Sequence, residues 1–160
     1  MACEKNKDTC VNLPKGYTID VDQDGNDDYK IYYSNFGAEY GCTEAAYVGP
    51  VDSNKVLNKS SHKLFLERGD TIYSEYTDPR FNWDDSGVTL MYNQVRYFQE
   101  PEETAWIPNS DHPFGHFVGI KIKRDENVKI GWMLFHLSRD DGQVILLDAK
   151  ITEEDWIVIQ

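Results

Sequence analysis

The sequence predicts a single all-β domain over residues 13–160, an antiparallel β-sandwich of jelly-roll-like connectivity with long loops and little helix. Short apolar or aromatic segments recur about every 8–12 residues, with Gly, Pro, Asp and Asn between them. No stretch of about twelve or more residues keeps a helical period. At 160 residues and 40% hydrophobic content, the chain is large enough to bury one core.

In the N-terminal half the strand signals are short. Residues 1–12 are polar and are expected to form a tether rather than part of the fold. Ala38–Val48 is compatible with either an irregular strand or a short helix, and residues 76–87 are rich enough in Asp, Pro, Asn and Gly to predict a long loop. The expected strands of this half are Tyr17–Ile19, Tyr29–Tyr33, Lys63–Leu66, Thr71–Ser74 and Val88–Tyr92.

The C-terminal half carries the clearest β pattern. Phe117–Lys123 alternates apolar residues with Lys, which predicts one buried and one solvated face. Asp141-Gly142 marks a hairpin turn, residues 101–108 read as another loop, and Trp132 and Trp156 are expected in the core. The further strands expected are Val95–Phe98, Phe117–Lys123, Val128–Leu137, Gln143–Ala149 and Trp156–Ile159.

An acidic stretch between the first two expected strands carries the clearest chemical signal. Its spacing matches a calcium loop, in which side-chain oxygens occupy positions 1, 3 and 5, Gly occupies position 6 and a carbonyl serves at position 7. Position 12 is Ile31 instead of Glu, which excludes an EF-hand, and an Asp at position 9 supplies the alternative closure. The predicted Ca²⁺ ligands are therefore Asp20, Asp22, Asp24, Asn26 and Asp28, with Gly25 at the turn.

A plain acidic turn is the alternative interpretation, because Asp-Gly and Asn-Asp are ordinary turn formers that water solvates well. Against it, the nine residues from Asp20 to Asp28 include five Asp, whose like charges repel one another. We therefore favour the metal loop, and Ca²⁺ over Mg²⁺, because all the ligands are protein oxygens on an irregular loop.

The same stretch, Ile19-Asp20 to Tyr29, resembles the opening strand pair of uncharacterised bacterial secreted and lipoprotein β-sandwich domains, which carry an early D-x-D-x-D-G-x-x-D-[YF] turn. Those domains also carry a late Gly-Trp strand, and Gly131–Ser138 followed by Gln143–Ala149 is similar to it. The resemblance covers about half of the chain, since residues 34–115 have no counterpart. It implies a fold and a compartment but no activity.

The N-terminal cysteines fit that compartment. Ala2-Cys3 followed by polar residues resembles the end of a lipobox, which would make Cys3 the lipid-bearing residue of a lipoprotein at the outer membrane or cell surface. Cys10 and Cys42 then remain as a candidate disulfide. On sequence alone, three cysteines allow three single pairings, and an intracellular protein with free thiols is the alternative.

Charge and motifs narrow the function classes. A net charge of −12 argues against binding of nucleic acid or of anionic membranes through the domain, so membrane contact is expected only through the N-terminal lipid. The sequence has no Gly-x-Ser-x-Gly elbow, phosphate loop or nucleotide fingerprint. With 28 acidic residues, a carboxylate pair for polysaccharide hydrolysis is always available and therefore carries no information.

Aromatic residues in the loops give a second candidate site. Tyr76, Phe81, Trp83 and Trp106 lie among Asp, Asn and Pro, a composition suited to stacking on sugar rings, although large aromatics more often close the ends of a sandwich. The sequence thus predicts an envelope-anchored, calcium-stabilised β-sandwich that binds a glycan or an envelope protein. A carboxylate-dependent polysaccharide hydrolase is the alternative.

Overall fold

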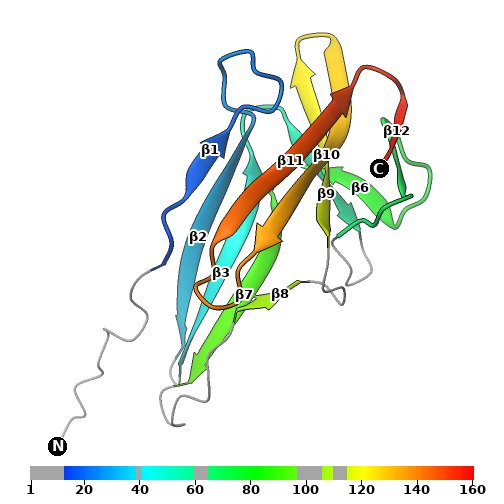
Figure 1. Cartoon of the computed structure of the whole chain (residues 1–160). Helices are drawn as coiled ribbons and strands as arrows, with labels where there is room; N and C mark the ends of the chain where they lie inside the picture. Colours follow the sequence, from blue (N-terminus) through cyan, green and yellow to red (C-terminus); the bar gives the residue numbers. More distant parts are fainter. Residues whose placement is uncertain (1–12, 39–40, 60–64, 97–105, 110–114) are drawn as a thin grey trace, which may run out of the picture.

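The computed structural model describes residues 13–38, 41–59, 65–96, 106–109 and 115–160, and the ordered elements in these ranges are all β-strands (Figure 1). The expected tether, residues 1–12, lies outside the described residues. Within those ranges no helix is long and apolar enough to cross a membrane.

The first sheet is antiparallel and has the strand order β1-β2-β3-β7-β8. Its long central strands run past the second sheet at one end of the molecule (Figure 1). The ambiguous segment Ala38–Val48 falls largely in β3, because that segment pairs with β2 on one side and with β7 on the other. The bounds are β1 Tyr17–Ile19, β2 Tyr29–Ala38, β3 Gly41–Pro50, β7 Val88–Arg96 and β8 Ile107–Pro108.

The second sheet is also antiparallel and has the order β11-β10-β9-β4-β6. Its β6 lies inside residues 76–87, so the prediction of one long loop there is wrong. The Asp- and Asn-rich segment still forms a strand because it pairs with β4, with Leu57 opposite Trp83. The bounds are β4 Lys55–Lys59, β6 Phe81–Asp84, β9 His116–Arg124, β10 Asn127–Leu137 and β11 Val144–Thr152.

A two-stranded ribbon of β5 (Thr71–Tyr73) and β12 (Trp156–Val158) covers part of the outer face of the second sheet. Both of its strands contact β10. Ile72 and Ile157 form a buried cluster with Phe117 and Trp132 of the second sheet. The second sheet is therefore buried on both faces where the ribbon lies.

Two apolar clusters result from this arrangement. The larger one fills the space between the two sheets, and the smaller one lies under the ribbon. Phe117–Lys123 was expected to have a solvated face, but Phe117 is 2% exposed and Gly119 is buried. That expectation is wrong because the ribbon covers this face, and only Lys123 near the end of β9 stays exposed.

The strand order confirms the predicted all-β sandwich and shows how its strands are connected. Consecutive hairpins join β1, β2 and β3 in one sheet and β9, β10 and β11 in the other. The chain crosses between the sheets from β3 to β4, from β6 to β7 and from β8 to β9.

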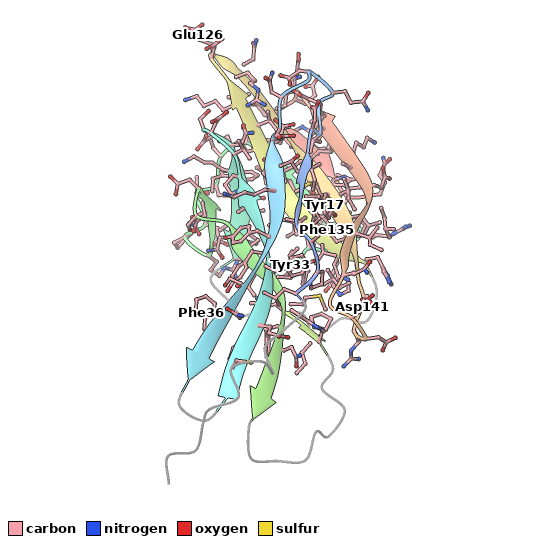
Figure 2. All side chains as sticks on the ribbon, turned by 90° about the vertical axis from the view of Figure 1, so that its left-hand side faces the viewer. Tyr17, Tyr33, Phe36, Glu126, Phe135 and Asp141 are labelled. Atoms are coloured by element: carbon pink, nitrogen blue, oxygen red, sulfur yellow. The ribbon has the colours of Figure 1, made fainter. Side chains whose placement is uncertain are left out.

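Two tyrosines join the sheets at the edge where β1 and β11 approach each other (Figure 2). The Tyr17 hydroxyl donates to the Val144 carbonyl at 3.1 Å and accepts from the Leu146 amide at 3.1 Å. The Val144 amide donates to the Tyr33 hydroxyl at 3.0 Å. These bonds satisfy backbone groups that an edge strand otherwise offers to another chain.

Candidate metal centre and aromatic groove

The acidic stretch forms the loop between β1 and β2. The last strand pair is Ile19 with Tyr29, and the Asp28 amide donates to the Ile19 carbonyl at 2.8 Å, so the loop comprises residues 20–28. Most hairpin loops have about 2–5 residues, and longer ones are often functional. Asp20 organises the interior of this loop, because its carboxylate accepts from the amides of Asp24 at 3.2 Å and Gly25 at 2.9 Å.

Three of the five predicted ligands lie together. One carboxylate oxygen each from Asp20, Asp22 and Asp28 falls within 4.8 Å of the others. Asp24 is not in this group. The backbone amide and side-chain amide of Asn26 both donate to Asp24 Oδ1, at 2.8 and 3.1 Å.

Asp28 is the buried member of the group, with no exposed surface. Its Oδ2 accepts from the amides of Val21 at 2.8 Å and Asp22 at 3.4 Å, and its Oδ1 accepts from Asn54 Nδ2 at 3.2 Å and Arg124 at 2.6 Å. Burial raises the pKa of the Asp28 carboxyl, while the two amide hydrogen bonds oppose that rise. The position of this carboxylate is therefore fixed from three separate segments.

Two cationic side chains that flank the β9–β10 turn form ion pairs with the acidic loop. Arg124 bonds both Asp24, at 3.3 Å, and Asp28, while Lys129 Nζ bonds Asp22 Oδ2 at 3.0 Å. The hydrogen bond to Asp22 raises the pKa of Lys129. Four carboxylates (Asp20, Asp22, Asp24 and Asp28) thus face two cations, so these six groups together carry a formal charge of −2.

The second oxygen of Asp22 is the unusual feature of the site. The Asp22 side chain is only 3% exposed, and its Oδ1 is buried without a hydrogen-bond partner. A buried ionised oxygen without a partner is costly, so native structures satisfy such atoms with a donor or an ion. This oxygen belongs to a residue of the three-carboxylate group.

The donor set defines the ion that fits. Carboxylate oxygens are ligands for hard cations, and an irregular loop tolerates the flexible geometry of Ca²⁺ better than the strict octahedron of Mg²⁺. A divalent cation would also cancel the formal charge of −2. Asp20, Asp22 and Asp28 can therefore hold a metal ion.

Three of the four aromatic candidates lie together beside the ribbon. Tyr76 stacks on Phe81 with ring centres 5.0 Å apart, and it contacts Trp83 at 6.3 Å. Trp83 Nε1 donates to the Ser74 carbonyl at 3.1 Å. Seven residues line an aromatic groove of about 480 Å³ here: Thr71, Tyr73, Glu75, Tyr76, Thr77, Asp78 and Phe81.

Trp106 belongs elsewhere and cannot stack on a ligand. It is 5% exposed in the core between the sheets, edge-on to Tyr33 with ring centres 6.4 Å apart. The Trp106 ring also lies against Gly142, where a side chain would collide with it. Its assignment as a sugar-binding residue is wrong because its ring is buried in the core against the Asp141-Gly142 turn.

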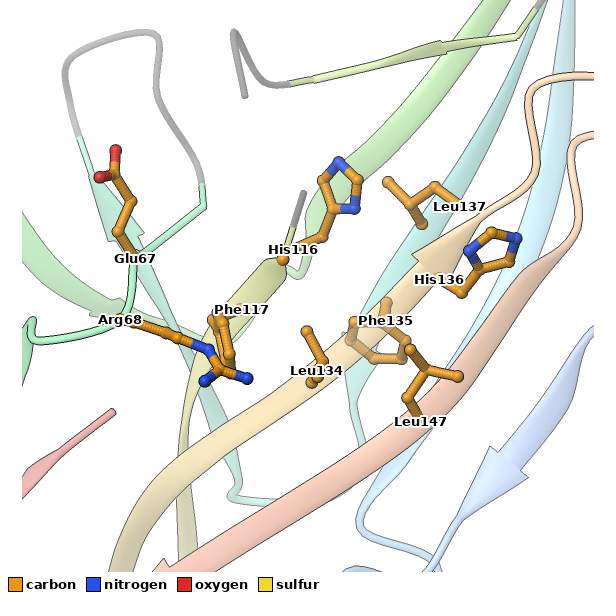
Figure 3. Close-up of a pocket in the computed structure, with 10 residues that line it drawn as sticks. Glu67, Arg68, His116, Phe117, Leu134, Phe135, His136, Leu137 and Leu147 are labelled. Atoms are coloured by element: carbon orange, nitrogen blue, oxygen red, sulfur yellow. The ribbon is translucent and has the colours of Figure 1, made fainter. Parts of the chain in front are cut away.

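A second hollow lies where β9 begins and β10 ends (Figure 3). His116 and His136 come from these neighbouring strands, and Leu134 and Leu147 lie beside them (Figure 3). His116 is 7% exposed, packs edge-on to Phe65, and has a pKa that burial lowers. It therefore acts as a packed core side chain.

Of the three cysteines, only Cys42 lies among the described residues. Cys42 is disulfide-bonded and buried in β3. Cys3, the expected lipid site, and Cys10, the expected disulfide partner, lie outside the described residues.

Sequence reasoning missed Arg124, Lys129 and Asn54 at the metal site, because nothing local shows that distant turns pack on the acidic loop. It also expected Trp156 in the core, whereas the side chain is 57% exposed, and it did not single out Tyr73, which is 48% exposed. Comparisons of the chain with protein-family models, with curated proteins and with solved structures found no match. The function is therefore argued from the fold and these two sites.

Proposed function

We propose that this protein is a calcium-stabilised β-sandwich with a binding role at the bacterial cell envelope, and that its ligand is a glycan or an envelope protein. The observation that carries the calcium site is the buried, unpartnered Asp22 Oδ1 within the three-carboxylate group. A cation at this position supplies the missing partner of that oxygen and offsets the remaining negative charge.

The role proposed for the ion is structural. The acidic loop leads into β2 of the first sheet. The two cations that contact it, Arg124 and Lys129, flank the turn between β9 and β10 of the second sheet. An ion bound only by the folded loop adds its binding free energy to the stability of the domain. Calcium would thereby hold one end of the sandwich closed.

The proposed extracellular location would suit this role. Extracellular calcium modules work with dissociation constants of about 10⁻⁴–10⁻³ M, a range suited to three carboxylates on a loop. A disulfide at Cys42 is also typical of an oxidising compartment. Lipid on Cys3 is the proposed anchor.

The aromatic groove bears on the hydrolase alternative, because Glu75 and Asp78 both line it. A glycosidase needs one carboxyl group with a raised pKa to act as general acid. Hydrogen bonding to Lys121 lowers the pKa of Glu75, and hydrogen bonding to Arg80 lowers the pKa of Asp78 to about 2. Both groups stay ionised near neutral pH, which favours binding over hydrolysis.

Isothermal titration calorimetry of Ca²⁺ into chelator-treated protein tests the calcium site. We expect one site with a dissociation constant of about 10⁻⁴–10⁻³ M. Asp22→Asn removes the charge from the unpartnered oxygen and should weaken binding by at least tenfold. No heat of binding to the wild type would reduce the acidic stretch to an ordinary turn.

Asp27→Asn is the matched control, because Asp27 is exposed on the same loop and lies outside the three-carboxylate group. It removes the same charge and should change the affinity only slightly, through long-range electrostatics that salt screens. Equal losses in both variants would indicate diffuse attraction of cations instead of a defined site.

A further inference from the structure

The outer face of the ribbon presents two aromatic side chains side by side. In the β5–β12 pair, Tyr73 lies directly opposite Trp156, and Ile72 lies opposite Ile157. The two Ile side chains face the second sheet and are buried, so strand alternation turns Tyr73 and Trp156 away from it. We call this pair the aromatic platform; its members are 48% and 57% exposed.

The platform is held in place from below and from its ends. The Ser74 amide donates to the Asp155 carbonyl at 2.8 Å, and the Ile159 amide donates to the Asp70 carbonyl at 3.0 Å. Tyr76 meets the Tyr73 ring edge-on at 5.8 Å and accepts from the Tyr73 amide through its hydroxyl at 3.2 Å. Directly opposed residues have Cβ atoms about 4.5–5.5 Å apart, so the two side chains start from neighbouring points on the outer face of the ribbon.

The aromatic groove continues this surface and adds polar groups. Tyr73 belongs to both features, since it lines the groove and pairs with Trp156. The polar side chains of the groove are the hydroxyls of Thr71 and Thr77 and the carboxylates of Glu75 and Asp78. Ionised carboxylates only accept hydrogen bonds, so a ligand here must offer several donors next to apolar faces.

Charge narrows the ligand further. None of the seven residues that line the groove is Lys or Arg. Two nearby cations bond the carboxylates of the groove, Lys121 to Glu75 at 2.8 Å and Arg80 to Asp78 at 2.6 Å, and Lys59 Nζ lies 5.4 Å from the centre of the Phe81 ring. Asp155 lies beside Trp156 on the chain. The residues that line the groove therefore offer an anionic ligand no cation of their own, and they suit an uncharged ligand rich in hydroxyl groups.

We propose that the aromatic platform and the adjoining groove bind a neutral polysaccharide, with sugar rings stacked on Tyr73 and Trp156 and hydroxyls bonded to Glu75, Asp78 and the two Thr. The inference rests on the proposed binding role and selects the glycan from its two ligand classes. The apolar C–H face of a pyranose covers the exposed rings, while its equatorial hydroxyls donate to the fixed carboxylates. A groove of about 480 Å³ is of the size that holds small ligands.

Binding of hexasaccharide probes, measured by calorimetry and tryptophan fluorescence, tests this proposal. The neutral probes are the hexamers of β-1,4-glucose, β-1,3-glucose, β-1,4-xylose, β-1,4-mannose and N-acetylglucosamine, and the anionic probes are polygalacturonate and heparin. We expect at least one neutral probe to bind and to perturb Trp156 emission, and both anionic probes to bind at least tenfold more weakly. Binding by no neutral probe, or preferential binding by an anionic one, overturns the proposal.

Three substitutions assign the site. Trp156→Ala and Tyr73→Ala should each weaken binding at least tenfold, whereas Trp156→Phe should retain most of it because a ring remains. Leu147→Ala is the control, since Leu147 is 60% exposed on β11 and lines the other hollow. All of these side chains are at least half or nearly half exposed, so the variants should unfold at the wild-type temperature.

If the platform substitutions leave the saccharide affinity unchanged, the saccharide binds elsewhere and the assignment is overturned. A basic protein that binds through Trp156 while no saccharide does would favour the envelope-protein ligand instead. These outcomes are separate from the calcium test, because loss of the saccharide site leaves Ca²⁺ titration at Asp22 intact. Conversely, if the protein does not bind calcium, saccharide binding can still be measured in EDTA.

Discussion

Asp22 has two carboxylate oxygens in different situations. Oδ2 bonds Lys129 at 3.0 Å, while Oδ1 is buried without a hydrogen-bond partner. Lys129 therefore neutralises part of the loop and at the same time places a positive charge next to the position proposed for calcium. Lys129 should therefore stabilise the ion-free protein but weaken the binding of calcium.

Lys129→Met should separate the two effects. Without the ammonium group, the ion-free protein loses a partner of Asp22 and unfolds at a lower temperature. Calcium, however, loses a repulsive neighbour worth about 2 kcal/mol, the energy of a double and a single positive charge about 4 Å apart in water, so its affinity should rise about thirtyfold. Calorimetry and thermal unfolding in EDTA measure the two changes.

Lys150→Met is the control for this prediction, because it removes the same charge from β11, where Lys150 bonds Gln160. It should leave calcium affinity within about twofold of the wild type. Weaker calcium binding by Lys129→Met would mean that the lysine supports the site instead of competing with the ion.

At the scale of the elements, Asn54 links the acidic loop to the second sheet. It is fully buried, its Nδ2 donates to the Asp28 carbonyl at 3.1 Å, and its Oδ1 accepts from the Lys123 amide at 2.9 Å. The start of β2 and the end of β9 therefore share one side chain. Sequence patterns do not reveal such a link, because Asn54 looks like an ordinary turn residue.

Asn54→Ala should destabilise the domain by about 1–3 kcal/mol, since it removes the acceptor of the Lys123 amide and one of the two donors to the Asp28 carbonyl, which keeps the Val51 amide. The urea unfolding midpoint measures the change. Ser53→Ala is the neighbouring control: its hydroxyl donates to the Lys123 carbonyl at 3.1 Å from an exposed position, and its loss should cost about 0.5 kcal/mol or less. Equal effects would contradict the linking role of Asn54.

The tyrosines at the β1–β11 edge make a second prediction at this scale. Tyr17→Phe and Tyr33→Phe each free backbone groups of β11 and should cost about 1 kcal/mol per hydrogen bond lost. The double variant should also self-associate through the exposed edge, as sedimentation velocity would show. Tyr32→Phe, whose ring stacks on Tyr47 at 5.0 Å, is the control. A double variant that stays monomeric and as stable as this control would contradict the account.

The strands that the sequence predicts best are those with strong local patterns. β9 to β11 were expected nearly at their observed bounds, because alternation and an Asp-Gly turn act locally. β6 was missed because its pairing with β4 overrides a loop-like composition. Trp156 was placed in the core because a period of two distinguishes the two faces of a strand but not which face another element covers.

For the whole molecule, the two sites lie on different parts of one sandwich. The acidic loop and the β9–β10 turn meet at one end, and the aromatic platform lies on the ribbon over the second sheet. The sequence located the three-carboxylate group because its members are near neighbours in the chain. The platform unites residues 73 and 156 through strand pairing, and the cations of the loop come from about a hundred residues further along, so neither could be predicted locally.

Thermal unfolding in 10 mM Ca²⁺ and in EDTA tests the central claim most directly. For a dissociation constant of about 10⁻⁴ M, calcium should stabilise the domain by about 2.7 kcal/mol. A chain of this size should then unfold about 5–10 °C higher. We expect this shift in the wild type and in Asp27→Asn, and its loss in Asp22→Asn. The same midpoint for the wild type in Ca²⁺ and in EDTA would contradict a structural calcium site.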